Sequence, residues 1–306
     1  MIALFGTTAE RLADLVESAK PLLPIPVLLV ALPILYLLFG KTWKELDAEA
    51  LELRAVSAAS GEFDRRPMVA LVMVSMVLTL QEYYGARQYY DVAVYPLLAS
   101  LDAVWHGGLK LGPYSELWGY GWWAGTRVFG YVLPLVLWKF FFPRDSLRDM
   151  GLRTRGFFKH AKIYGLFLAT VLPAMLVVSK SPDFGNYYPF YKGSSRSYVD
   201  FGIWELMYYA QFFALELFFR GFMLRALRSF GSGAIFAMAA PYCMIHYGKP
   251  YLEACGAIIA GVALGSLSMK TKSIWQGFLV HVTVAALMDW LSLYHRHALP
   301  THLWRI

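Results

Sequence analysis

Long apolar runs dominate this sequence and constrain its fold more than any other feature. Several of them reach the roughly 20 residues that an α-helix needs to cross a bilayer. Charged residues make up only 16% of the chain, against about 25% in an ordinary soluble domain, so little polar surface is available to keep such runs in water. Within a bilayer a helix satisfies all of its own backbone hydrogen bonds. We therefore expect an all-α fold, a polytopic integral membrane helix bundle.

The runs predict about eight transmembrane helices. We expect them at 21–40, 67–84, 118–142, 163–178, 201–224, 234–247, 251–269 and 274–294. The residues before 21 are expected to form a short amphipathic lead-in, and the charged stretch at 41–66 a helix outside the membrane. The segment 86–117 is apolar but short and interrupted by Pro96. It leaves open a re-entrant or lumen-side helix, or a further span that would invert the topology of everything before it.

These spans divide the chain into four expected regions. They are an N-terminal membrane region of three spans and the charged helix (1–142), a basic cytoplasmic linker (143–162), a second membrane region (163–294) and a C-terminal tail (295–306). The Tyr-, Gly-, Ser- and Pro-rich segment at 181–200 is expected outside the membrane, as a connecting loop in preference to a cover over a site.

The net charge of +7 is explained by where the basic residues fall. Most loop lysines and arginines lie on one side of the predicted membrane, with the largest group at 139–162. Because basic loops are retained in the cytoplasm, both termini are expected outside. Membrane topology thus accounts for the charge, and no nucleic-acid partner is expected. The expected location is the cytoplasmic (inner) membrane, where the basic loops would contact anionic lipid.

The two cysteines, Cys243 and Cys255, lie inside apolar segments. Two cysteines in such places predict neither a disulfide framework nor a metal cluster. We expect both to act as small buried apolar side chains.

The stretch FALELFFRGFML (213–224) places an ionisable pair in a predicted span. Glu216 and Arg220 are four residues apart and therefore share one helix face. Charged groups at membrane depth are costly and are usually functional. A structural ion pair that pins the helix remains the alternative.

Two histidines lie in other predicted spans. His246 ends the sixth span, one turn after Tyr242, and His281 lies deep in the eighth, with Asp289 eight residues on. Taken alone, His246 fits an interfacial histidine, whereas His281 needs a partner at its depth.

A carboxylate and two imidazoles from three helices are suited to hydrolysis. The carboxylate activates water as general base, one imidazole shares that task or holds a metal, and the other donates to the developing oxyanion. The spacing alone does not distinguish such a site from the proton relay of a transporter.

The carboxy half resembles the CPBP family of intramembrane proteases, which includes the type II CAAX prenyl endopeptidases and bacteriocin-processing or self-immunity (Abi) proteins. The family motif Glu-Glu-x-x-x-Arg is matched by LELFFRG at 215–221. An aromatic followed by three residues and His is matched by YCMIH at 242–246, and His-x-x-x-Asn by HVTVA at 281–285. The segments SLRDMGLRTR and GKPYLEACGAIIAGVALGSLSMKTKSIWQGFLVH also look alike, so the resemblance covers about 145–293 and identifies 163–294 as a CPBP-like core.

Two positions depart from the family pattern. Leu215 replaces the glutamate that the family uses as water-activating base, and Ala285 replaces the polar residue that helps hold the oxyanion. One helical residue is a rotation of about 100°, so Glu216 does not automatically face the same cavity. Asp289, one turn further, is the expected stand-in for Ala285, although a carboxylate serves an oxyanion badly unless it is protonated.

The resemblance implies an intramembrane endopeptidase that cleaves a membrane-anchored protein or peptide. It implies Glu216 and His246 as water activators and His281 as oxyanion stabiliser, supported by Arg220, Tyr242, Glu253 and Asp289. No cofactor is certain; if the reaction needs a divalent metal such as zinc, the expected ligands are Glu216, His246 and His281. Two alternatives stay open: a catalytically degenerate membrane chaperone or adaptor, and a transporter that uses the buried groups as a relay.

Overall fold

The computed structural model describes residues 18–22, 24–154, 161–180, 182–249 and 251–305. Helix dominates these residues, and they form no strand beyond an isolated bridge between Leu152 and Ser273. The all-α prediction is therefore confirmed. Residues 1–17 of the predicted amphipathic lead-in and residues 155–160 of the predicted basic linker lie outside the described residues.

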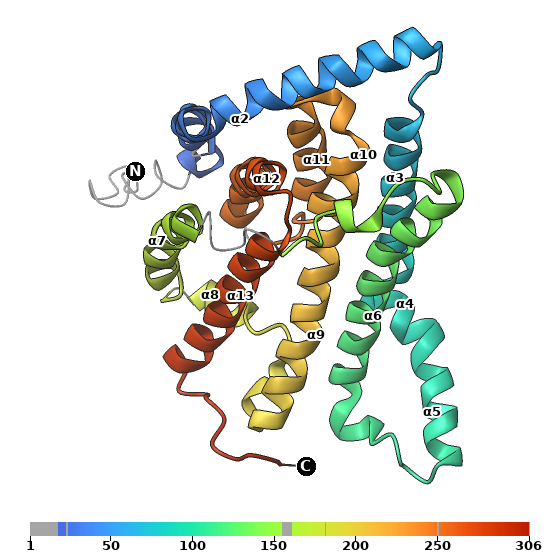
Figure 1. Ribbon diagram of the computed structural model, residues 1–306. Helices are drawn as coiled ribbons and strands as arrows, with labels where there is room; N and C mark the ends of the chain where they lie inside the picture. Colours follow the sequence, from blue (N-terminus) through green and yellow to red (C-terminus); the bar gives the residue numbers. More distant parts are fainter. Residues whose placement is uncertain (1–17, 23, 155–160, 181, 250, 306) are drawn as a thin grey trace, which may run out of the picture.

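The helices are arranged as Figure 1 shows. Their bounds are α2 (Pro24–Ser60), α3 (Arg66–Tyr84), α4 (Arg87–Tyr89), α5 (Tyr95–Val104), α6 (Leu111–Phe141), α7 (Ala161–Val178), α8 (Pro182–Tyr187), α9 (Tyr198–Glu216), α10 (Leu224–Ala226), α11 (Gly233–Met244), α12 (Tyr251–Thr271) and α13 (Trp275–His295). Wider π-helical turns cover Tyr90–Val94 and Leu217–Met223, and 3₁₀ turns cover Lys20–Leu22, Leu147–Asp149, Lys192–Ser195 and Arg228–Phe230.

Four of the described helices are long and apolar enough to cross a membrane: α2, α3, α12 and α13. The predicted span at 234–247 is the shorter helix α11, with 12 residues. At 1.5 Å per residue it is about 18 Å long, less than the roughly 30 Å hydrocarbon core. The structure thus supports a multi-helix membrane protein, and the count of eight spans stays a prediction.

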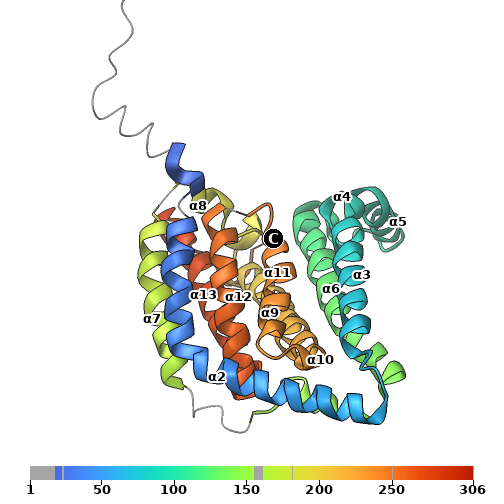
Figure 2. The same ribbon diagram turned by 90° about the horizontal axis from the view of Figure 1, so that it is seen from above.

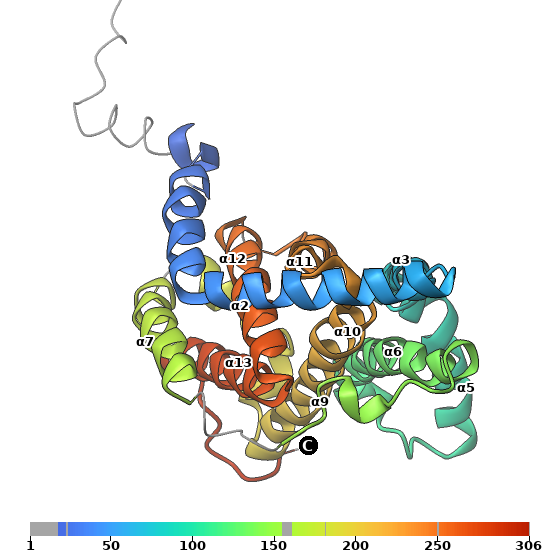
Figure 3. The same ribbon diagram turned by 45° about the horizontal axis from the view of Figure 1, so that its top comes forward.

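The predicted first span and much of the charged stretch at 41–66 form one bent helix of 37 residues, α2. Its second half turns away from the first and lies across the ends of α10, α11 and α12 (Figure 3). Trp43 Nε1 donates to Ser266 Oγ at 2.9 Å, and Asp47 Oδ1 accepts from the Ser232 backbone N–H at 2.7 Å. These bonds fix the charged half of α2 to the ends of the bundle helices.

The segment 86–117, for which the sequence left the topology open, is mostly helical. It continues in the direction of α3 as far as the end of α5, and α6 then runs back (Figure 1). This segment therefore adds no reversal between α3 and α6. None of the α5 side chains is buried.

The surface and the interior have the polarity that a bilayer selects. Large apolar side chains such as Leu37 on α2 and Phe140 on α6 are 83% and 79% exposed, whereas Glu216 and Asp289 are completely buried. Buried charges inside an apolar exterior are typical of membrane bundles. Together with the apolar helices, this identifies an integral membrane protein. Along one side of it, the first half of α2, α7 and α12 lie nearly parallel (Figure 2).

Helix α9 and the π-helical turn after it occupy the centre of the fold. Every residue of Leu217–Met223 is buried, among them Phe218, Phe219 and Phe222. The segment before α7 packs onto this turn, because the Met150 carbonyl lies where a Cβ on Gly221 would come within 2.3 Å. A wide turn of this kind often marks a functional site, and here it directly follows Glu216.

Candidate functional site

Glu216 is the last residue of α9 and points toward α13. Its Oε1 lies 3.1 Å from Nη1 of Arg220 and 2.8 Å from Nδ1 of His281. The absence of a side chain at Gly277 makes room for it, because a Cβ there would lie 2.5 Å from Glu216 Oε2. The carboxylate is therefore enclosed between two helices.

Arg220 has a fully buried side chain, so it does not extend to the membrane surface. Its Cζ lies 3.8 Å from the centre of the Tyr242 ring. The guanidinium thus has a carboxylate on one side and the negative face of an aromatic ring on the other. This arrangement compensates a charge that would otherwise be costly to bury.

His281 is held at both ring nitrogens. Nδ1 faces Glu216, and Nε2 lies 3.0 Å from the hydroxyl oxygen of Tyr242. Because an ionised carboxylate only accepts, the neutral tautomer that suits both neighbours has its proton on Nδ1 and accepts from the tyrosine hydroxyl at Nε2. Phe212 stacks on the imidazole at 5.2 Å with an angle of 10° between the rings. The result is a fixed chain from Glu216 through His281 to Tyr242.

His246 follows α11, and its ring packs against Tyr242 at 4.8 Å between centroids. Its Nδ1 donates to the Tyr242 carbonyl oxygen at 2.8 Å. In the neutral ring this leaves Nε2 unprotonated, so His246 has an acceptor available there.

Both histidines line one cavity of about 340 Å³. Leu215 and Ala285 line it with them, and Glu216 is not among its lining residues. The two positions that depart from the family pattern therefore face the histidines, whereas the retained glutamate is rotated out of the cavity.

The loop at 182–197 contributes to the wall of this cavity and is more than a connection. Tyr187, Tyr188 and Phe190 line it. The Tyr188 hydroxyl donates to Glu253 Oε2 at 2.7 Å, and Lys249 Nζ donates to Glu253 Oε1 at 2.8 Å. Preferring a simple connecting loop at 181–200 was wrong. Glu253 is the carboxylate nearest in sequence to His246 that lines the cavity, and both of its oxygens are occupied.

Sequence reasoning missed two polar residues of the cavity wall, Arg127 on α6 and Gln211 on α9. Arg127 Nη1 donates to Gln81 Oε1 at 3.1 Å. The available signal was the same one that selected Glu216: a charge inside a predicted span.

Asp289 is not part of the cavity wall. Its Oδ2 accepts from Trp204 Nε1 at 2.6 Å. The side chain is thus bound to α9 and directed away from the position where a substitute for Ala285 would act.

The described residues do not form a metal centre. No group of three His, Cys, Asp or Glu side chains in this part of the chain has metal-ligand geometry. The positive Arg220 guanidinium contacts Glu216 Oε1, and both nitrogens of His281 are engaged. The expected zinc set of Glu216, His246 and His281 therefore does not fit a cation. Cys243 and Cys255 are free and half-buried rather than fully buried.

Comparison with known proteins supports the resemblance read from the motifs. Residues 200–287 match the family described as type II CAAX prenyl endopeptidase Rce1-like. This stretch runs from α9 into α13 and contains Glu216, Arg220, Tyr242, His246 and His281. The family resemblance is thereby confirmed for this part of the chain, and it indicates a protease-type membrane protein. Searches of the curated proteins and of the solved structures gave no significant match.

Proposed function

We propose that this chain is a membrane protein of the CAAX prenyl endopeptidase type that binds a membrane-anchored protein or peptide in its cavity without cleaving it. The proposal rests on the position of Leu215. It lines the cavity beside both histidines, at the position where the family resemblance places the water-activating glutamate.

Hydrolysis needs a general base within hydrogen-bonding reach of a water. Glu216 Oε1 contacts Arg220 and His281, its Oε2 lies against the position of a Gly277 Cβ, and the residue does not line the cavity. Glu253 lines the cavity, but its oxygens accept from Tyr188 and Lys249, which weakens it as a base. Both carboxylates are therefore committed to structural contacts.

An oxyanion needs hydrogen-bond donors aimed at the place where charge develops. Ala285 offers no side-chain donor, and neutral His246 has an unprotonated Nε2 because its Nδ1 donates to Tyr242. Neither position 285 nor His246 therefore offers the donor that an oxyanion would need there.

The features needed for binding are present. The cavity is lined by aromatic side chains from α6, α9, α11 and the loop at 182–197, with a few polar groups among them. Predominantly apolar walls with few polar groups are typical of ligand sites. Such a cavity suits an extended peptide or its attached lipid.

One observation favours a second candidate, an active intramembrane endopeptidase. A carboxylate that holds an imidazole in one tautomer is the arrangement of a general-base histidine, and Glu216 and His281 have this contact at 2.8 Å. The His281 side chain is 16% exposed. In this candidate His281, and not Glu216, would activate the water.

Cleavage of a farnesylated CaaX peptide in proteoliposomes separates the two candidates. The proposal predicts that the wild type binds the peptide but does not cut it, and that Leu215→Glu combined with Ala285→Asn gains cleavage. Leu215→Gln with Ala285→Asn is the matched control without the carboxylate and should stay inactive. Wild-type cleavage that is lost in His281→Ala would establish the second candidate. If no variant cleaves and the wild type does not bind, both are wrong.

A further inference from the structure

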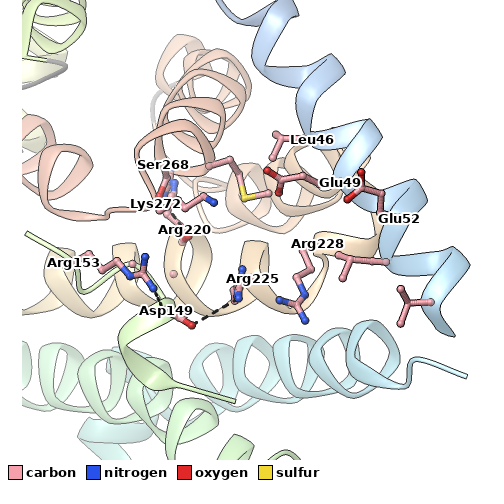
Figure 4. A pocket seen from close by; sticks show the side chains of 15 residues that line it. Leu46, Glu49, Glu52, Asp149, Arg153, Arg220, Arg225, Arg228, Ser268 and Lys272 are labelled. Atoms are coloured by element: carbon pink, nitrogen blue, oxygen red, sulfur yellow. Dashed lines mark hydrogen bonds and ion pairs between the residues drawn. The ribbon is translucent and has the colours of Figure 1, made fainter. Parts of the chain in front are cut away.

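A second cavity, of about 420 Å³, lies between the charged half of α2 and the ends of α10 and α12 (Figure 4). It is separate from the cavity that the histidines line. Its walls combine charges of both signs with apolar side chains. On one side the charged residues are Asp149, Arg153, Arg220, Arg225, Arg228 and Lys272, and on α2 they are Glu49 and Glu52. Arg220 is the residue already paired with Glu216.

The basic wall has more positive charge than its own partners neutralise. Asp149 forms ion pairs with Arg153 and, at 3.8 Å, with Arg225. Arg228 and Lys272 form no salt bridge with any described residue. Burial lowers the pKa of Arg225, and the neighbouring charges of Arg228 and Arg153 lower it further. This wall therefore favours an added anion.

The opposite wall favours a cation. Glu49 and Glu52 are exposed on the same stretch of α2 and face the arginines across the cavity (Figure 4). Neither forms a salt bridge with any described residue. A plain phosphate bound to the arginines would face these two carboxylates, which is unfavourable.

Apolar side chains complete the cavity. Leu46, Leu53 and Val56 on α2 and Met269 on α12 line it. Such side chains suit the glycerol backbone and upper acyl chains of a lipid.

The cavity is held rigidly by the fold. Trp43 and Asp47 attach α2 to Ser266 and Ser232. On the other side, the Gly151 carbonyl accepts from the Ile274 N–H at 2.9 Å. Both walls therefore keep a fixed separation, as a built binding site requires.

We propose that this cavity binds the headgroup of a zwitterionic phospholipid with a primary ammonium, that is, a phosphatidylethanolamine. The phosphate would bind Arg225 and Arg228, since arginine binds phosphate oxygens well. The ammonium, two carbons away, would donate to Glu49 or Glu52. A choline headgroup has no N–H to donate, and an anionic glycerol headgroup has no cation for the carboxylates. The charged half of α2 begins where its apolar half ends, which is the depth at which headgroups lie.

Native mass spectrometry of the full chain, with phosphatidylethanolamine, phosphatidylcholine or phosphatidylglycerol added in turn, tests the assignment. We expect the ethanolamine lipid to bind at least about tenfold more tightly than the other two, the factor that one charge-assisted hydrogen bond contributes. Arg225→Gln with Arg228→Gln should remove this binding. Glu49→Gln with Glu52→Gln should shift the preference toward phosphatidylglycerol.

Lys44→Gln and Glu45→Gln are matched controls, because both residues are exposed on α2 and do not line the cavity. Lys272→Gln is a further test variant, because this residue is exposed and its replacement should not disturb the packing. This variant should bind the lipid more weakly than the wild type. Soluble phosphorylethanolamine distinguishes a lipid site from a site for a small phosphate. Equal binding of all three lipids, equal binding of the soluble headgroup, or binding unchanged in the arginine and lysine variants would overturn the proposal.

Discussion

Oε1 of Glu216 lies 2.8 Å from Nδ1 of His281 and also 3.1 Å from Nη1 of Arg220. One buried oxygen thus joins α9, the π-helical turn after it and α13, and through Tyr242 the contact extends to α11. A carboxylate with these contacts stabilises the arrangement of the helices. This explains how the glutamate can be retained when the neighbouring position in the cavity is leucine.

The ion pair of Glu216 and Arg220 should be strongly coupled. Either Glu216→Gln or Arg220→Gln leaves the other charge buried without its partner, which typically costs about 3–5 kcal/mol. The double variant should lose clearly less than the sum of the two single losses. The free energy of unfolding in mixed detergent micelles gives the three values.

The exposed pair Lys41 and Glu45 on α2 is the control for that cycle, because it has the same i, i+4 spacing with its charged atoms 4.0 Å apart. Its double-mutant cycle should give a coupling of about 0–1 kcal/mol, as surface ion pairs do. A coupling for Glu216 and Arg220 as small as this would contradict the structural role assigned to them.

Gly277→Ala should disturb the site through a single methyl group. Its Cβ would lie 2.5 Å from Glu216 Oε2, so the carboxylate must move away from α13. We expect a loss of stability, although alanine is normally better than glycine in a helix by about 1 kcal/mol. Gly256→Ala on α12 is the control, because nothing lies within 4 Å of its Cβ position. Equal thermal midpoints for the two variants would show that the carboxylate does not occupy this position.

The sequence predicts the helices well and the orientation of single side chains less well. Apolar runs place α3, α12 and α13 within a few residues of their true bounds, and the motifs select Glu216, Arg220 and His281, which lie together. The apolar run shows where the predicted first span ends, but it does not show where the helix ends. The charged stretch that follows is also helical, so α2 continues through both without a break.

Orientation depends on partners from distant parts of the chain. Asp289 follows Ala285 by one helical turn, yet Trp204 on α9 binds it and holds it away from the cavity. Likewise, the room that Gly277 provides decides where Glu216 points. These are tertiary contacts, so no local pattern in the sequence could reveal them.

Stability should decrease at acidic pH through Asp145. Burial alone would raise the pKa of this carboxyl, but hydrogen bonds from Arg66 and Trp138 outweigh it and hold the pKa below its usual value. A depressed pKa in the folded state contributes stability that is complete above the unfolded value of about 3.9. It is lost as the pH falls through the folded value.

The thermal midpoint of the wild type, followed by tryptophan fluorescence, should therefore fall more steeply below about pH 4 than that of Asp145→Asn. Glu45→Gln, at an exposed position, should follow the wild type. Parallel curves for the wild type and Asp145→Asn would exclude this contribution.

Asp289 should tolerate an amide better than a truncation. Asp289→Asn keeps an acceptor for Trp204 Nε1, so stability should change by less than about 1 kcal/mol. Asp289→Ala leaves the buried indole N–H without its acceptor and should cost about 1–3 kcal/mol. Equal losses in the two variants would mean that the hydrogen bond from Trp204 to Asp289 contributes nothing.

Capture of a peptide in the cavity tests the central claim most directly. A photo-crosslinking amino acid at Val284, which lines the cavity, is activated in proteoliposomes that contain a farnesylated CaaX peptide, and the mass of the captured peptide is measured. The same amino acid at Phe140, exposed on the outer face of α6, controls for capture from the bilayer. We expect capture at Val284 of the intact peptide only. Capture of a shortened peptide would show that the cavity cleaves its ligand, and no capture above the Phe140 control would show that it does not bind one.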